Sequence, residues 1–166
     1  LLKCLRRHLW QCSSLTIHSN KIMTGIYIHI PFCKSKCPYC DFHSNRCNSQ
    51  QQEAYVKALL REIKDLTGVK EFISHDLGST DTLYLGGGTP SVLNGAQIEE
   101  IVTAAREKFN IPETAEITIE CNPGSPIEEL IPHFKSCGIN RVSLGMQSAV
   151  DKERRLLGRT SDADRV

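Results

Sequence analysis

Residues 25–40 read GIYIHIPFCKSKCPYC, a short apolar run that leads directly into three closely spaced cysteines. Its first part is rich in β-branched residues, and such runs predict a strand. Pro31 ends the run, because proline cannot donate a backbone hydrogen bond within a sheet. The cysteines then follow the pattern C-x₃-C-x₂-C, at Cys33, Cys37 and Cys40. The chain therefore places a candidate metal or cluster loop directly after its first predicted strand.

Strand-like and helix-like segments alternate along the rest of the chain. Asn94 and Gln97 form a predicted capping box, while Ser125 as N-cap and Pro126 as the first helical residue predict another helix start. Alternation of this kind is typical of an α/β fold with a parallel sheet and right-handed crossovers. The strands are expected at 25–30, 82–85, 115–121 and 141–144, and the helices at about 50–66, 95–109, 126–137 and 151–157.

The whole chain has 166 residues of ordinary globular composition, of which 40% are hydrophobic and 23% charged. This composition excludes a fully disordered or collagen-like chain. No stretch approaches the roughly 18 uncharged apolar residues of a membrane-spanning helix. The formal net charge of +1 gives no reason to expect nucleic acid or an anionic membrane as a partner. A closed (β/α)₈ barrel takes about 250 residues, so we expect an open sheet and further units beyond the C-terminus.

The first 22 residues differ in charge from the rest of the chain. They contain basic residues and no acidic residue, whereas residues 23–166 hold 16 basic and 19 acidic residues. An acid-free leader that contains Arg and Ser can be an organelle transit peptide. Because Met23 shortly precedes the first predicted strand, we interpret residues 1–22 as an upstream extension or leader and 23–166 as the folded part. The expected localisation is cytoplasmic, or mitochondrial if residues 1–22 are a transit peptide.

The clustered cysteines are the clearest chemical signal among the eight cysteines of the chain. Residues 1–22 lack the apolar core and cleavage site of a secretory signal, so the cluster indicates a metal site rather than a disulfide framework. Three thiolates are one short of the usual four-ligand set, and a [4Fe–4S] cluster held by three would keep one iron open. A zinc knuckle with His29 or His43 as fourth ligand is one alternative, and unligated thiols are another.

Polar motifs follow the other predicted strands at the same end. Residues 86–90 read GGGTP after the second strand, Glu120 lies at the end of the third, and Gln147 follows the fourth. Arg159 comes after the last helix. Three successive glycines expose bare backbone groups to anything placed above the strand. The carboxyl ends of parallel strands meet at one edge, where α/β proteins place their sites, so we expect one composite site.

Four ordered motifs resemble the opening of radical S-adenosylmethionine (SAM) enzymes. Together they are similar to the oxygen-independent coproporphyrinogen III oxidase group, which includes the haem chaperone (HemW) branch. The resemblance covers residues 25–166 and implies a partial (β/α) barrel of the radical SAM type, truncated after about four βα units. Residues 23–166 would then be the N-terminal part of a radical SAM core domain. The motifs are IYIHIPFC with the two further cysteines (26–40), LGGGTPS (85–91), ECNPG (120–124) and SLGMQS (143–148).

The resemblance also implies cofactors and the residues that hold them. A [4Fe–4S] cluster would chelate the amino and carboxylate groups of SAM at its open iron. Reductive cleavage of SAM would give a 5′-deoxyadenosyl radical that removes a hydrogen atom from a substrate, so the cofactor supplies the difficult chemistry. No catalytic side chain is assigned. The implied cluster ligands are Cys33, Cys37 and Cys40. The implied SAM contacts are Gly87, Gly88 and Thr89 for the methionyl part, Glu120, Gln147 and Arg159 for other polar parts, and Tyr27 and Tyr39 around cluster and cofactor.

One position favours the chaperone branch over the oxidases. Oxidase members carry a further cysteine two positions after the third cluster ligand, where this chain has Phe42. We therefore expect haem or porphyrin binding and transfer, with an electron donor and a haem-accepting protein that the sequence does not name. The alternatives are an oxygen-independent coproporphyrinogen III oxidase, which would be an enzyme, and a zinc-stabilised α/β binding module. The sequence leaves open whether the protein is an enzyme.

Overall fold

The computed structural model describes residues 2–6, 22–66 and 77–159, with side chains for 25–66 and 80–159. No helix among these residues has the length and apolar character needed to cross a membrane. The strands are β1 (Leu2–Arg6), β2 (Ile22–Ile30), β3 (Leu77–Gly87), β4 (Glu116–Cys121) and β5 (Arg141–Leu144). The helices are α1 (Ser49–Asp65), α3 (Gly95–Phe109), α4 (Ile127–Cys137) and α5 (Asp151–Leu156), and a short 3₁₀ helix, η1, spans Pro90–Val92.

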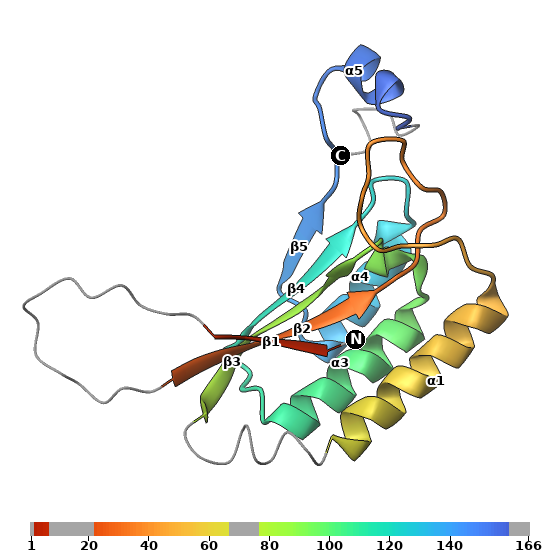
Figure 1. The fold of residues 1–166 in the computed structure, drawn as a ribbon. Coiled ribbons are helices and arrows are strands. Elements are labelled where there is room, and N and C mark those ends of the chain that lie inside the picture. Colours follow the sequence, from red (N-terminus) through yellow and green to blue (C-terminus); the bar gives the residue numbers. More distant parts are fainter. Residues whose placement is uncertain (1, 7–21, 67–76, 160–166) are drawn as a thin grey trace, which may run out of the picture.

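The strands form one sheet in the order β1-β2-β3-β4-β5 (Figure 1). From β2 to β5 the strands are parallel, and each pairs with the next strand along the chain. Because the order advances in one direction while α1, α3 and α4 stay on one face, the sheet has the arrangement of an open (β/α) barrel. A doubly wound sheet would reverse its order and carry helices on both faces. The predicted α/β class, with four βα units and an unclosed sheet, is confirmed.

The strand β1 is an element that the sequence analysis does not predict. It pairs antiparallel with β2, from Leu2 opposite Ile28 to Arg6 opposite Thr24. It belongs to the segment that we interpret as an upstream extension or leader, of which residues 7–21 lie outside the described part. An added edge strand covers the outer backbone N–H and C=O groups of β2, which an exposed edge would leave unpaired.

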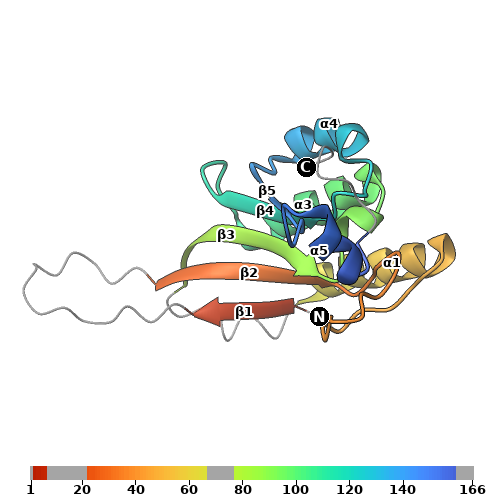
Figure 2. The same ribbon diagram turned by 90° about the horizontal axis from the view of Figure 1, so that it is seen from above.

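The sheet has one apolar face and one polar, aromatic face. Helices α1, α3 and α4 pack on the apolar face (Figures 1 and 2), where Ile28, Leu85 and Ile119 occupy matching register positions and are fully buried. Burial of one such side chain contributes about 1.5–3 kcal/mol, so this layer is the main source of stability. Side chains alternate along a strand, so Tyr27 and Tyr84 lie on the opposite face. That face is free to carry the polar groups of a site.

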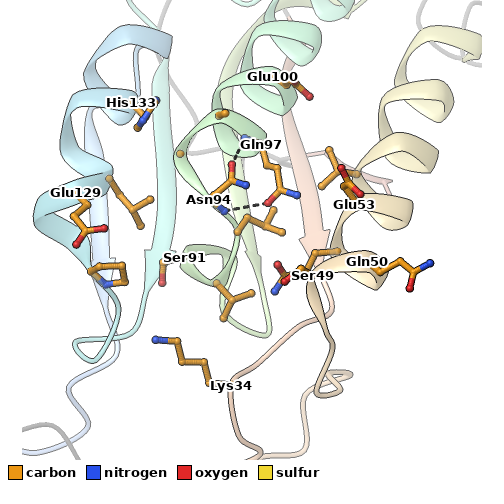
Figure 3. Close-up of a pocket in the computed structure, with 18 of the residues that line it drawn as sticks. Lys34, Ser49, Gln50, Glu53, Ser91, Asn94, Gln97, Glu100, Glu129 and His133 are labelled. Atoms are coloured by element: carbon orange, nitrogen blue, oxygen red, sulfur yellow. Dashed lines mark hydrogen bonds between the residues drawn. The ribbon is translucent and has the colours of Figure 1, made fainter.

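A local capping box marks the start of α3, whereas no side-chain cap is formed at the start of α4. At α3 the Asn94 side chain accepts from the Gln97 N–H at 2.9 Å, and the Gln97 side chain accepts from the Asn94 N–H at 3.0 Å, as predicted (Figure 3). The predicted Ser125 cap of α4 is wrong, because Pro126 is the N-cap residue there. The Ser125 hydroxyl instead hydrogen bonds to that of Ser91 at 2.7 Å. A tertiary partner has replaced the local cap.

Backbone hydrogen bonds beyond the strand ends attach the cysteine loop to the sheet. The N–H of Gly88 donates to the carbonyl of Ile30 at 2.9 Å, and the N–H of Thr89 donates to that of Phe32 at 2.7 Å. The approach is so close that a Cβ added at Gly88 would lie 2.5 Å from the Phe32 carbonyl oxygen. The glycine turn and the start of the cysteine loop therefore form one packed unit.

Gly88→Ala is expected to lower the free energy of unfolding by about 1–3 kcal/mol, as overpacking does in other cores. The added Cβ would displace the Phe32 carbonyl and weaken the attachment of the loop. Gly124→Ala is the matched control, since its Cβ would meet Asn122 Oδ1 at 3.5 Å, an ordinary contact. Urea denaturation measures both variants against the wild type. Equal stability of the two variants would contradict this packing constraint.

Candidate functional site

A cavity of about 450 Å³ opens at the carboxyl ends of the strands. Its wall is built from the cysteine loop after β2, the glycine turn after β3, the end of β4, and the segments after β5 and α5. This volume is in the range of small-molecule and cofactor sites. Nine of the eleven predicted site residues line the cavity, namely Cys33, Cys37, Tyr39, Cys40, Gly88, Thr89, Glu120, Gln147 and Arg159.

The three loop cysteines are half-buried free thiols in the wall of this cavity. The N–H of Cys40 donates to the carbonyl of Cys37 at 3.0 Å, which closes a tight turn around Tyr39. A set of three soft thiolates suits an iron–sulfur cluster, in which each thiolate binds a different iron and the sulfurs need not converge on one ion. The donor set and the adjoining cavity therefore fit a cluster that keeps one iron open.

Both ring nitrogens of His29, a candidate fourth ligand for zinc, are engaged within the chain. Its Nε2 lies 2.9 Å from the carbonyl oxygen of His43, and its Nδ1 lies 3.3 Å from the hydroxyl of Tyr27. Neither histidine is part of the cavity lining. In the described part of the chain, no group of three or more His, Cys, Asp or Glu gathers as it would around one metal ion. His29 ties the cysteine loop to β2 rather than facing the thiols.

Glu120 is oriented at the cavity wall by two hydrogen bonds. The Tyr84 hydroxyl donates to its Oε1 at 2.7 Å, and the Gly87 N–H donates to its Oε2 at 3.1 Å. Burial, the hydrogen bond and the negative charge of Glu120 raise the pKa of Tyr84 to about 12, so the phenol stays a donor at neutral pH. Tyr27 stacks on Tyr84 with ring centroids 5.9 Å apart, and burial and the charge of Glu120 raise the pKa of Tyr27 as well.

Two predicted site residues, Tyr27 and Gly87, lie outside the cavity lining. Gly87 donates its N–H to Glu120, and Tyr27 stacks on Tyr84. Gly87 has a φ of 117°, which favours glycine, and an added Cβ would lie 2.6 Å from His29 Nδ1. From the sequence, the glycine run is expected to expose its backbone to a ligand. At Gly87 the structure gives an internal reason, the packing of His29, whereas Gly88 does reach the cavity.

Tyr84 is a residue of the site that the sequence analysis misses. It lies within an apolar run that reads as a strand buried on both faces. The available signal is strand periodicity, because the register opposite Tyr27 places both side chains on the same face of the sheet. From that face, the Tyr84 side chain reaches the end of the neighbouring strand, where it contacts Glu120.

Arg159 reaches back to the cysteine loop from the segment after α5. Its Nε donates to the Tyr39 hydroxyl at 3.0 Å, and its guanidinium carbon lies 5.9 Å from the centroid of the Tyr39 ring. A Cβ added at Gly158, where φ is 71°, would lie 3.1 Å from Pro38. Burial raises the pKa of Tyr39, while Arg159 acts in the opposite direction. Figure 1 shows α5 beside this loop, beyond the ends of the strands.

Gln147 has a φ of 72°, a left-handed conformation that is uncommon for a residue with a side chain. Backbone conformations of this kind cost about 1–3 kcal/mol and gather at ligand sites. The side-chain nitrogen of Gln147 lies close to Gly145, where an added Cβ would be 3.3 Å away. The uncommon backbone and the position in the cavity wall make Gln147 a ligand contact by our prediction.

Cys47, Cys121 and Cys137, the cysteines outside the loop whose side chains the structure describes, have different surroundings. Cys121 and Cys137 are buried, and burial raises the pKa of both thiols, that of Cys121 to about 11. Such thiols stay protonated at neutral pH and are poor metal ligands. Cys47 is half-buried, accepts a hydrogen bond from Gln52 at 3.4 Å and is not part of the cavity lining.

A larger hollow of about 1090 Å³ lies elsewhere, across the amino-terminal parts of α1, α3 and α4. Figure 3 shows Lys34, Glu53, Glu100 and Glu129 among its lining side chains, which thus carry charges of both signs. None of the eleven predicted site residues belongs to its lining. Volume alone does not identify a site, and the smaller cavity collects the cysteines and the strand-end residues.

Comparison with known proteins agrees with this geometry. The family model of the radical SAM superfamily matches residues 27–166. The heme chaperone HemW of Lactococcus lactis is 37% identical over 134 residues, which cover 81% of this chain and 33% of the relative. Anaerobilin synthase of Escherichia coli O157:H7 is 38% identical over 137 residues, which cover 82% of this chain and 30% of the relative.

A solved structure resembles this one at the level of fold and sequence. It is coproporphyrinogen III oxidase (HemN) from Escherichia coli, a radical SAM enzyme, with a TM-score of 0.72 and 33% identity over 84% of this chain and 31% of that chain. The chain thus spans about a third of the length of the relatives it matches. The family match includes all three loop cysteines and the whole cavity wall. The chain therefore belongs to the radical SAM superfamily, whose members bind an iron–sulfur cluster and SAM.

Proposed function

We propose that the chain is the cofactor-binding part of a haem chaperone of the radical SAM superfamily, with a [4Fe–4S] cluster and SAM in one site. The convergence of nine predicted residues on one cavity carries this proposal. Cys33, Cys37 and Cys40 would ligate three irons and keep the fourth open to SAM. When bound, the cluster and SAM supply one-electron chemistry, and the chain's residues hold and orient them.

Residues of both charges in the cavity wall would orient SAM. SAM carries positive and negative groups, and Glu120 and Arg159 provide one charge of each sign in the same wall. Tyr84 fixes the Glu120 carboxylate, and Tyr39 fixes the Arg159 guanidinium. Because both charged groups are already held by a partner, little side-chain freedom is lost when a ligand binds.

Phe42 is the observation that favours a chaperone over an oxidase. It lies in the cavity lining, and 66% of its surface is exposed. Two positions after the third loop cysteine, where the oxidases carry a further cysteine, this chain places an apolar ring. Sequence identity does not separate the candidates, since the chaperone, the anaerobilin synthase and the oxidase are 37%, 38% and 33% identical to this chain. The oxygen-independent coproporphyrinogen III oxidase is therefore the second candidate.

We also propose binding partners and a cellular location for the protein. Haem or a porphyrin is the expected ligand, an electron donor would reduce the cluster, and a haem-accepting protein would receive the cargo. The expected localisation is the cytoplasm, with the mitochondrion as the alternative if residues 1–22 act as a transit peptide.

Haem titration and turnover distinguish the two candidates. The full-length protein, reconstituted anaerobically with iron and sulfide, is expected to bind haem at about one equivalent per chain, followed by haem absorption. With SAM and a reductant it is expected to leave coproporphyrinogen III unchanged. Oxidative decarboxylation of coproporphyrinogen III would establish the oxidase instead. Failure both to bind haem and to turn over the porphyrinogen would contradict both candidates.

Cys37→Ala is expected to abolish cluster assembly, because two remaining thiolates are too few to hold a four-iron cluster. Cys47→Ala and Cys137→Ala should load normally, since neither thiol is part of the cavity lining. Iron and acid-labile sulfide per chain are measured after anaerobic reconstitution, with about four of each expected in the wild type. Equal iron in all variants, or zinc without sulfide in the wild type, would refute the ligand assignment.

Glu120→Gln is expected to weaken SAM binding roughly tenfold while leaving the iron content unchanged, since hydrogen bonds to charged groups contribute about 1.5–3 kcal/mol. Glu116→Gln is the matched control, because Glu116 lies on the same strand and pairs with Arg141 at 3.0 Å outside the cavity lining. Equilibrium dialysis with labelled SAM measures both affinities. If the two variants bind SAM equally well, Glu120 is not a ligand of the cofactor.

A further inference from the structure

We propose that the Thr89 hydroxyl donates a hydrogen bond to the Cys33 sulfur and thereby raises the reduction potential of the cluster. Thr89 Oγ1 and Cys33 Sγ lie 3.4 Å apart, although the two residues are 56 positions apart in the sequence. The resemblance to radical SAM enzymes implies that Thr89 contacts SAM, so this is a different role. The inference rests on the proposed function in one respect, that Cys33 ligates a cluster.

Backbone contacts on both sides fix this distance. The N–H of Thr89 donates to the carbonyl of Phe32 at 2.7 Å, one residue before Cys33. The N–H of Cys33 donates to the carbonyl of Asn45 at 3.0 Å, which holds the cysteine at the base of its loop. Threonine is also stiff at χ1, so its hydroxyl has few directions to take. The contact is therefore set by the backbone before any cluster binds.

Gly88 makes this approach possible. A Cβ at this position would lie 2.5 Å from the Phe32 carbonyl oxygen, so a larger residue would push the turn away from the loop. The third glycine of the run thus has a second explanation besides exposure to a ligand. It allows the next residue, Thr89, to come within hydrogen-bond distance of Cys33.

The chemistry of a ligated cysteine determines the direction of the bond. A cysteine bound to iron is a thiolate and carries no proton, so the hydroxyl must be the donor. A hydrogen bond to a ligating sulfur stabilises the more negative, reduced cluster more than the oxidised one, and such bonds are among the determinants of cluster potential. Thr89 is therefore a positioning residue that acts through Cys33, because its hydrogen bond to the sulfur makes the cluster easier to reduce.

The test compares Thr89→Val with Thr89→Ser in the full-length, anaerobically reconstituted protein without SAM. Redox titration followed by EPR gives the midpoint potential of the cluster. Thr89→Val is expected to shift it to a more negative value, because the donor is lost at nearly constant volume, while Thr89→Ser keeps the donor and the wild-type potential. Thr118→Val is the matched control, since the Thr118 hydroxyl donates to Glu116 at 3.1 Å and is not part of the cavity lining.

An unchanged SAM-free potential in a fully loaded Thr89→Val protein overturns the inference, even if SAM then binds more weakly. That combination would make Thr89 a contact to SAM alone. A shift in the potential of Thr89→Ser equal to that of Thr89→Val also overturns it, because the hydroxyl would then be irrelevant.

If Thr89→Val does not take up iron and sulfide, Thr89→Ala is titrated instead. Loss of iron in both, with full iron in Thr89→Ser, overturns the inference about the potential, because the hydroxyl would then be needed to retain the cluster. If the wild-type protein holds no iron and sulfide after reconstitution, the proposed function itself is wrong. The iron and sulfide analysis detects that outcome independently of the redox titration.

Discussion

Two backbone hydrogen bonds, from Gly88 to Ile30 and from Thr89 to Phe32, continue the parallel ladder of β2 and β3 past the ends of both strands. They hold the cysteine loop against the glycine turn so closely that no side chain fits at position 88. The thiol of Cys33 therefore has a fixed neighbour across the turn. The ends of β4 and β5 and the segment after α5 complete the cavity wall around this contact between the cysteine loop and the glycine turn.

The division of the sheet into two faces separates stability from chemistry. The face toward α1, α3 and α4 buries Ile and Leu side chains, and their burial is largely independent of any cofactor. On the other face, Tyr27 stacks on Tyr84, which in turn holds the carboxylate of Glu120. The orientation of a charged group at the strand ends is thus determined by side chains deeper in the sheet. Binding residues that are held in place in this way lose little freedom when a ligand arrives.

Much of the fold and of the site could be predicted because the signals are local. Strand runs, the Asn94 capping box and the rule that parallel strands end at one edge gave four βα units and brought nine site residues to one cavity. Features that depend on tertiary partners could not be predicted in this way. Ser125 hydrogen bonds across to Ser91 instead of capping α4, and Gly87 is required by the ring of His29. The roles of the predicted site residues toward cluster and SAM stay predictions.

The most direct test of a shared cluster and SAM site is the EPR spectrum of the reduced full-length protein, recorded with and without SAM after anaerobic reconstitution. We expect the signal of a reduced [4Fe–4S] cluster and a change in its g values when SAM is added, because SAM would bind the open iron. A cluster signal that SAM leaves unchanged would contradict a shared site. A protein that holds zinc and gives no cluster signal would contradict the assignment of Cys33, Cys37 and Cys40 as cluster ligands.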